Sequence, residues 1–123
     1  MDRKILVVED NDKNRRLIGD VLKYYGYDVI EAVNGDEGIN MTREYKPDLI
    51  LMDMQMPVMD GFTAMKILKN DPTTKHIRII AITSFAMTGD KERIMSAGAD
   101  DYISKPVNTM ELPMRIEKLL GKE

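Results

Sequence analysis

The sequence predicts an α/β fold in which one five-stranded parallel sheet has helices on both faces. Five short apolar segments alternate with five segments of helical periodicity. Segments 4–8 and 49–52 are almost continuously apolar, which is typical of strands buried on both faces of a parallel sheet. Regular alternation of this kind implies right-handed crossovers, and therefore a single doubly wound sheet.

The composition is that of an ordinary globular domain. Of 123 residues, 43% are hydrophobic and 32% charged, so we expect one domain over residues 1–123 and no effector domain. The chain has no cysteine, which excludes a disulfide framework and a cysteine nucleophile. A net charge of −3 argues against nucleic acid as the main partner. There is no signal peptide and no apolar run of about 18 residues, so we expect a cytoplasmic protein without membrane contact.

Turn and capping residues set the expected element boundaries. The apolar segments predict strands at 4–8, 28–32, 49–53, 77–83 and 102–104. The connecting helices begin at capping or turn residues and mostly end at glycine or before proline. We expect them from Asn11 or Asp12 to Gly26, from Asn34-Gly35 to Lys46-Pro47, from Gly61 to Asn70, from Thr88 to Gly98, and from Asn108 to Leu120.

Apolar residues at helical spacing predict which side of each helix faces the core. The helix at 88–98 has few large apolar residues, mainly Ile94 and Met95, so it should be the least firmly docked and is a candidate moving part. In the other helices the predicted inward residues are Leu17, Ile18, Val21, Leu22 and Tyr25; Ile39, Met41 or Thr42, and Tyr45; Phe62, Met65 and Leu68; and Leu112, Ile116, Leu119 and Leu120.

The start of the last helix has two readings. Asn108 and Glu111 resemble a capping box, which would begin the helix early. Pro113 falls just past the first turn of such a helix and would remove one of its hydrogen bonds. The sequence therefore predicts either a late start or a kink at Pro113, and both stay open.

Five polar residues gather at the C-terminal ends of four predicted strands. In chain order they are Glu9, Asp10, Asp53, Thr83 and Lys105. Asp53 ends the buried strand, and Met56-Pro57 then turns the chain away from the sheet. Each residue alone has an ordinary explanation, as a helix cap, a strand threonine or a solvated lysine. Together they predict a site, because open α/β sheets bind ligands at the C-terminal edge of their strands.

The chemistry of this set favours a metal and a phosphoryl group. Three adjacent carboxylates repel one another, so at least one pKa should rise without a metal. Mg²⁺ would relieve the repulsion, with Asp10 and Asp53 as direct ligands and Glu9 acting through water. A carboxylate can also act as a nucleophile and form an aspartyl phosphate. Lys105 and Thr83 would then stabilise the charge on the phosphoryl oxygens.

With these residues in place, the chain resembles the receiver domain of two-component response regulators over its whole length. The motifs that carry the resemblance are Glu9-Asp10, Asp53 with Met56-Pro57 and Asp60-Gly61, Thr83, and Lys105-Pro106. The resemblance implies a flavodoxin-like (βα)5 fold with strand order 2-1-3-4-5. The chain resembles single-domain receivers especially, and it also resembles receivers fused to hybrid histidine kinases.

The resemblance also implies roles for individual residues. Asp53 would accept a phosphoryl group from a phosphohistidine of a sensor kinase or a histidine phosphotransfer protein. Mg²⁺ would be held by Asp10, Asp53 and the backbone carbonyl of Gln55, with Glu9 supporting through water. Lys105 would pair with the acyl phosphate. Its peptide bond to Pro106 would be cis.

A conformational switch is implied in the same way. Thr83 would move toward the phosphoryl group and Tyr102 would turn inward behind it. The surface of the fourth helix, fifth strand and fifth helix would then bind a downstream protein partner. A phosphorylation-dependent dimer and an unchanged monomer both fit the sequence.

Three other functions compete with that of a phosphorylated receiver. An aspartate-nucleophile Mg²⁺ phosphatase of the haloacid-dehalogenase type needs an acid two residues after the nucleophile, where this chain has Gln55. A flavodoxin-like cofactor carrier needs a Ser/Thr/Gly-rich phosphate loop, where residues 9–12 are mostly acidic. A phosphate-independent protein-binding scaffold stays open. Arg15 and Arg16 are interpreted as a solvated helix face in preference to a site that steers an acidic partner.

Overall fold

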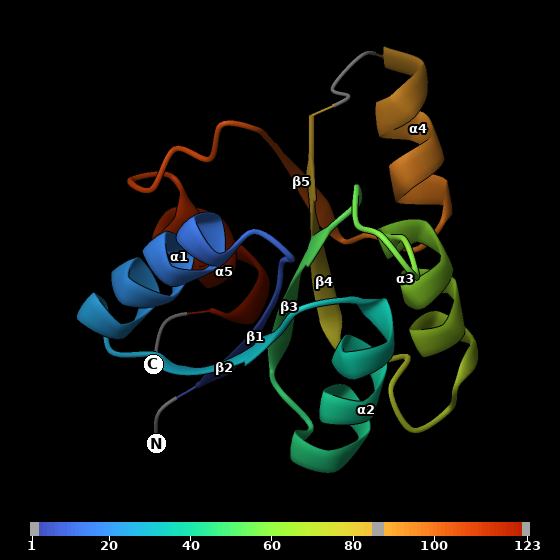
Figure 1. Ribbon diagram of the computed structural model, residues 1–123, viewed down its shortest axis with the longest axis horizontal. Helices are drawn as coiled ribbons and strands as arrows, with labels where there is room; N and C mark the ends of the chain where they lie inside the picture. The colour runs from blue at the N-terminus through green and yellow to red at the C-terminus, as the bar shows by residue number, and fades with distance from the viewer. Residues whose placement is uncertain (1–2, 85–87, 122–123) are drawn as a thin grey trace.

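The computed structural model describes residues 3–84 and 88–121, which form three layers (Figure 1). The middle layer is a parallel sheet in the order β2-β1-β3-β4-β5, as expected. Its strands are β1 (Lys4–Val8), β2 (Asp28–Ala32), β3 (Leu49–Asp53), β4 (Arg78–Thr83) and β5 (Asp101–Ser104). β4 begins one residue later than predicted and β5 one residue earlier.

The helices divide between the two faces of the sheet. In Figure 1, α1 (Asp12–Tyr24) and α5 (Leu112–Leu120) lie on one face. The opposite face is covered by α2 (Gly35–Tyr45), α3 (Gly61–Asn70) and α4 (Thr88–Ser96). None of the helices in the described ranges is long and apolar enough to cross a membrane.

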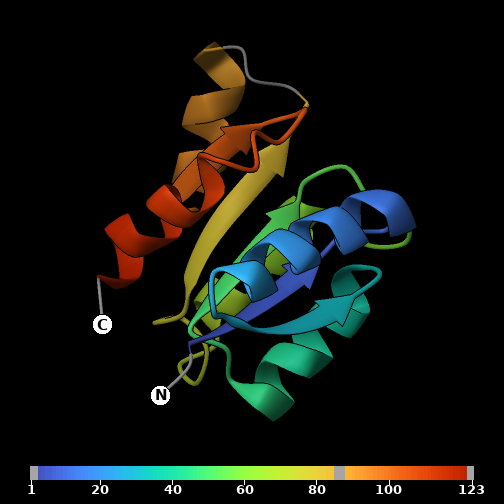
Figure 2. The ribbon, with the colours of Figure 1, turned by 90° about the vertical axis from the view of Figure 1, so that its left-hand side faces the viewer.

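Parallel pairing brings the C-terminal ends of the strands to one edge of the sheet. The arrows in Figure 2 all point the same way. Val8 is paired with Met52 in the β1–β3 ladder, and Asp53 is paired with Ile82 in the β3–β4 ladder. Thr83 is paired with Ser104 at the end of the next ladder. The residues that follow each strand are therefore neighbours in space although they are far apart in the chain.

The core has two halves because the strands are apolar on both faces. Leu6 and Val8 face the layer of α2, α3 and α4, whereas Ile5 and Val7 face α1 and α5. All four residues of β3 before Asp53 are fully buried, which confirms the prediction for this segment. The central strands are thus covered on both sides, and the site at their ends rests on a close-packed base.

The inward side of α1 differs from the prediction. Leu17 and Tyr25 are each 53% exposed, whereas Ile18, Gly19 and Leu22 are buried. A Cβ at Gly19 would lie 3.5 Å from Glu31 Oε2, so this residue faces β2 at ordinary packing distance. The side of α1 that carries Ile18, Gly19 and Leu22 therefore faces the sheet, and Leu17 and Tyr25 lie outside it.

The other helices need smaller corrections. In α2 Thr42 is the buried alternative, with its Oγ1 donating to Gly38 O at 2.7 Å. Tyr45, expected to be inward, is 44% exposed at the last residue of that helix. In α4 Ile94 is buried and Met95 is 38% exposed, so of the two only Ile94 docks fully.

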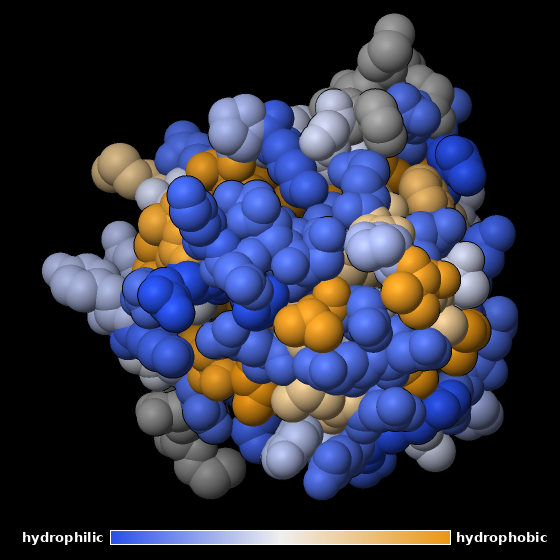
Figure 3. Space-filling view, in the orientation of Figure 1, coloured by the Kyte–Doolittle hydropathy of each residue, from blue (hydrophilic) through white to orange (hydrophobic). Residues whose placement is uncertain are grey.

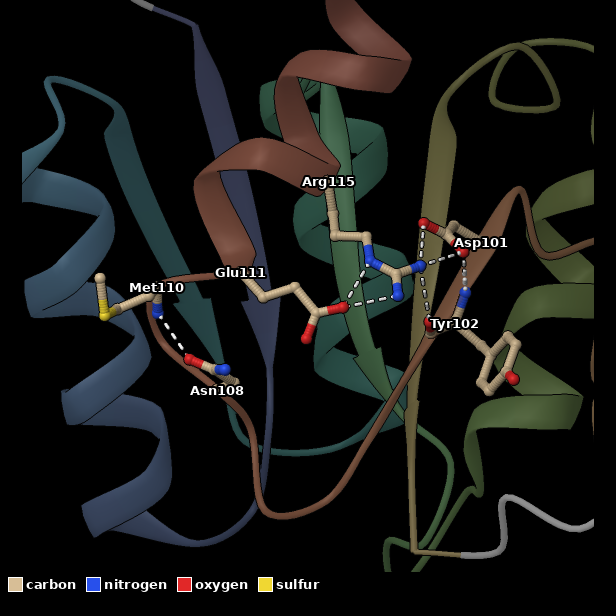
Figure 4. A network of polar contacts seen from close by, with 6 residues as sticks. All are labelled: Asp101, Tyr102, Asn108, Met110, Glu111 and Arg115. Atoms are coloured by element: carbon tan, nitrogen blue, oxygen red, sulfur yellow. Dashed lines mark hydrogen bonds and ion pairs between the residues drawn. The ribbon is translucent and has the colours of Figure 1, made fainter.

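The start of α5 corrects the capping-box prediction. The helix begins late, at Leu112, with Pro113 in its first turn. Figure 4 shows the reason: the Glu111 carboxylate turns to Arg115, whose guanidinium donates to Glu111 Oε1 at 2.6 and 2.9 Å. Asn108 Oδ1 instead accepts from Met110 N at 3.0 Å. Of the two readings of Pro113, the structure has the late start.

The loop between β3 and α3 packs against the end of β3, and a glycine, Gly61, makes this close contact. Asp60 caps α3 by accepting from Thr63 N at 2.8 Å. A Cβ at Gly61 would lie 2.5 Å from the backbone oxygen of Asp53 and 2.8 Å from Met54 Cα. A side chain at this position would therefore push the loop away from the strand end that carries Asp53.

We expect Gly61→Ala to lower the free energy of unfolding by about 1 to 3 kcal/mol, because the added methyl group overlaps backbone atoms that have no room to move. Urea unfolding followed by circular dichroism measures this. Thr63→Ala, an exposed change in the same helix turn, is the control and should stay within about 0.5 kcal/mol of wild type. Equal stability of Gly61→Ala and wild type would contradict the close approach.

Candidate functional site

The five polar residues singled out in the sequence meet at the C-terminal edge of the sheet. Glu9, Asp53 and Thr83 are almost completely buried, with 1–2% of their surface exposed. Asp10 is exposed at the rim. One carboxylate oxygen from each of Glu9, Asp10 and Asp53 lies within 4.8 Å of the other two. Strand order alone therefore assembles the acid cluster that was predicted.

Lys105 supplies the positive charge in this cluster. Its Nζ lies 2.9 Å from Asp53 Oδ1, and its side chain is 23% exposed. The same oxygen accepts from Gln55 N at 3.0 Å. The backbone N–H of Lys105 donates to Thr83 O at 2.8 Å, which fixes the lysine beside β4. The peptide bond from Lys105 to Pro106 is cis, as expected.

Two oxygens in the cluster are buried without a hydrogen-bond partner among the described residues. They are Glu9 Oε2 and Asp53 Oδ2. Buried polar atoms are normally paired, so a pair of unpartnered carboxylate oxygens side by side indicates a missing ligand. A hard divalent cation fits this donor set, because Mg²⁺ prefers carboxylate oxygens and water in octahedral geometry.

Burial is the main cause of a strong perturbation at Glu9. Removal from water, together with the adjacent Asp53 carboxylate, raises the pKa of Glu9 to about 8. The Lys105 charge acts in the opposite direction and does not cancel the effect. Burial and the adjacent carboxylate therefore favour the protonated form of Glu9 in the metal-free cluster, as expected for adjacent carboxylates.

The side chain of Gln55 links two loops, which the sequence did not predict. Its Nε2 donates to Thr83 Oγ1 at 3.0 Å, and its Oε1 accepts from Ser84 N at 3.0 Å. The resemblance implied only that the backbone carbonyl of Gln55 would be a Mg²⁺ ligand. The pairing of Asp53 with Ile82 brings residue 55 beside the end of β4, a contact that only the tertiary arrangement creates.

Arg15 corrects a second interpretation. The sequence indicated a solvated helix face, but the Arg15 side chain is only 14% exposed. Its guanidinium contacts Asp12, Glu31 and the backbone oxygen of Glu9. Arg16, the next residue, is exposed as expected.

Tyr102 is a residue of β5, and its side chain lies between the sheet and α4. It is half-buried, and its ring centroid is 5.4 Å from Lys91 Nζ on α4. In Figure 4 the ring points away from Arg115, which holds the neighbouring Asp101 through two contacts of 2.9 Å. Tyr102 thus connects a firmly held strand to α4.

A cleft of about 440 Å³ opens beside the acid cluster. Its walls come from α1 and from the segment before α5: Glu9, Asn14, Leu17, Ile18, Ser84, Lys105, Pro106 and Val107. Figure 3 shows hydrophobic surface among hydrophilic residues on the side where α1 and α5 lie. The described chain therefore presents an apolar wall next to its buried carboxylates.

Comparison with known families decides the identity of the domain. A model of the response regulator receiver domain matches residues 5–117. The chain belongs to this family. The fold and the motifs on which the resemblance rested are accordingly those of a receiver domain.

Individual relatives agree with the assignment. The polar-differentiation response regulator DivK of Brucella anthropi is 43% identical over 121 residues, 98% of each chain. The receiver domain of the Pseudomonas aeruginosa sensor histidine kinase PA1611, solved with a magnesium ion in its active-site cleft, is 33% identical with a TM-score of 0.90, over 99% of this chain and all of that one. The receiver domain of Saccharomyces cerevisiae Ssk1, solved with the histidine phosphotransfer protein Ypd1, is 30% identical with a TM-score of 0.89, over 95% and 88% of the two chains.

The raised pKa of Glu9 predicts a pH-dependent stability of the metal-free receiver. The folded state keeps a proton that the unfolded chain loses above about pH 4.5, so stability falls as pH rises from there toward 8. We expect Glu9→Gln to remove this fall and to be more stable than wild type at pH 8 by a few kcal/mol, since one pKa unit corresponds to about 1.4 kcal/mol.

Urea unfolding in EDTA at several pH values measures the difference. The difference should shrink as pH falls and disappear below about pH 4.5, where Glu9 of wild type is protonated in both states. Glu44→Gln, an exposed glutamate on α2, is the control and should show no pH-dependent difference. A Glu9→Gln variant that is less stable than wild type at pH 8 would refute the raised pKa.

Proposed function

We propose that this receiver domain works in the cytoplasm as a phosphorylation-activated switch whose acceptor is Asp53. The observation that carries the proposal is the state of its carboxylate. Asp53 is 1% exposed, Oδ1 is held by Lys105 and by Gln55 N, and Oδ2 has no partner among the described residues. One oxygen of the acceptor is thus anchored by protein groups, and the other faces the acid cluster without a described partner.

The proposed transfer uses the Asp53 carboxylate as the nucleophile. A carboxylate oxygen attacks phosphorus, the new O–P bond forms, and the P–N bond to the donor histidine breaks with its electron pair returning to the imidazole. Lys105 stays beside the acceptor and balances charge on the phosphoryl oxygens. Asp10, Asp53 and the Gln55 backbone carbonyl would hold Mg²⁺, with Glu9 acting through water. When bound, Mg²⁺ supplies further charge neutralisation during the transfer.

The proposed switch begins at Thr83. Its hydroxyl oxygen accepts from Gln55 Nε2, and its O–H would donate to a phosphoryl oxygen on Asp53 as the side chain moves toward it. Thr83 is the last residue of β4, and α4 begins at Thr88. Movement of Thr83, with Tyr102 following, would shift the population toward a second arrangement of α4, β5 and α5, which would bind a downstream protein.

A protein that carries phosphohistidine is the proposed donor. Such a donor must reach Asp53 from the open edge of the sheet, where the cleft beside α1 lies. Leu17 on its wall is 53% exposed, so it is available to pack against an apolar surface of the donor. The complex of Ypd1 with the Ssk1 receiver supports a partner of this class.

Intact mass after incubation with a small acyl phosphate and Mg²⁺ tests the acceptor. We expect wild type to gain one phosphoryl group, about 80 Da, and Asp53→Asn to gain none. Asp60→Asn is the control and should be phosphorylated like wild type, since asparagine also caps a helix.

Two results would overturn the proposal in different ways. A phosphoryl group on Asp53→Asn would move the acceptor elsewhere. If neither the small donor nor a phosphohistidine protein modifies wild type at any Mg²⁺ concentration, the phosphate-independent scaffold would be favoured instead.

The donor surface is tested by comparing two kinds of donor. We expect Leu17→Asp to slow transfer from a phosphorylated histidine phosphotransfer protein by roughly tenfold, because a buried charge would replace an apolar contact. Transfer from the small donor should be unchanged. Tyr45→Asp, a similarly exposed apolar position on α2, is the control and should behave as wild type with both donors. Equal slowing with both donors would mean that Leu17 acts on the site itself.

A further inference from the structure

Arg15 joins three parts of the structure that meet behind the acid cluster. Its Nη1 donates to Glu9 O at 2.9 Å, and its Nε donates to Glu31 Oε1 on β2 at 3.1 Å. Nη2 contacts Asp12 Oδ1 at 2.5 Å in the first turn of α1. All three guanidinium nitrogens are therefore used, in a side chain that is 14% exposed.

The Glu9 peptide group is held from both ends as a result. Its N–H donates to Ala32 O at 3.1 Å, which continues the β1–β2 ladder by one bond. Its carbonyl lies beyond the last strand residue, and Arg15 provides the described donor for it. This backbone segment carries two of the three clustered carboxylates, on Glu9 and Asp10.

We propose that Arg15 is a positioning residue that holds the Glu9–Asp10 turn in the geometry needed to bind Mg²⁺. The inference rests on the proposed function, because it assumes that the acid cluster binds this metal. The physical need is clear in the metal-free state. Repulsion from Asp53 pushes the turn that carries Asp10 away from β3, and a backbone anchor opposes that movement without occupying any ligand oxygen.

A positioning role of Arg15 and a purely electrostatic role of its charge predict opposite effects on Mg²⁺ binding. A guanidinium near a cation site repels the cation, so removing its charge alone should tighten Mg²⁺ binding. Loss of a geometric anchor should weaken binding. Arg15→Lys separates the two further, since lysine keeps the charge but cannot contact three acceptors in a planar fork.

Arg16 offers a matched control on the same helix. It is exposed, and no ion pair or hydrogen bond of its side chain is found among the described residues. Arg16→Ala therefore removes one positive charge from the same helix and leaves every described contact of the turn intact.

Calorimetric Mg²⁺ titration of unphosphorylated protein is the test. We expect the Mg²⁺ Kd to rise about tenfold in Arg15→Lys and in Arg15→Ala, the lower end of the usual effect of residues that orient metal ligands. The Kd of Arg16→Ala should be unchanged or slightly lower. In the metal-free state, hydrogen exchange of the Glu9 amide should be faster in Arg15→Lys, whereas the melting temperature should stay close to wild type.

The outcomes separate the two proposals. If wild type does not bind Mg²⁺, the proposed metal-dependent function fails, and this inference with it. If wild type binds Mg²⁺ and Arg15→Lys has the same Kd and the same Glu9 exchange, only the positioning role fails. Tighter binding by Arg15→Ala, as for Arg16→Ala, would show that Arg15 acts through charge alone. Should Arg15→Ala not fold, Arg15→Lys still decides between these results.

Discussion

The confinement of three carboxylates at the end of a buried sheet is the constraint on which the rest of the structure depends. Glu9, Asp10 and Asp53 repel one another, and two of them are almost fully removed from water. Close-packed parallel strands impose this arrangement, because their paired backbones cannot separate without breaking the ladders on either side. Lys105 offsets part of the charge, and the raised pKa of Glu9 shows that the remainder is not neutralised. Unfavourable electrostatics of this kind favour the binding of an added cation.

At the same edge of the sheet, some side chains are held rigidly and others can move. The β3 carboxylate is fixed by its strand, whereas the Thr83 hydroxyl is joined to Gln55 of the β3–α3 loop by one side-chain hydrogen bond. One hydrogen bond of this type contributes about 1 kcal/mol, so a new charge at Asp53 can compete with it. On the far side, Arg115 ties the start of α5 to Asp101 of β5. These contacts hold β5 and the start of α5 together as one unit.

Two arginines illustrate how context changes the meaning of a charged residue. Arg15 and Arg115 each lie on a helix where an exposed charge would be unremarkable in sequence. Both instead use several nitrogens to fasten a helix to a strand or strand end, with 14% and 34% of their side chains exposed. The planar guanidinium makes this feasible, because it contacts several acceptors in fixed directions. Glu111 shows the consequence, since its contact with Arg115 replaces the capping role that its spacing suggested.

The sequence by itself determined the fold and the members of the acid cluster. Strand 49–53 is apolar enough to be buried on both faces, and parallel strands must end at one edge, so Asp53 and Glu9 follow from local pattern alone. Only the tertiary structure decided the rotation of α1, which exposes Leu17, and the side-chain partners of Gln55 and Arg15. Hydrophobic periodicity is a property of a whole helix or strand, so it does not depend on the exact position of any one side chain. A hydrogen bond depends on distances of a few tenths of an ångström between residues far apart in the chain, which no local pattern records.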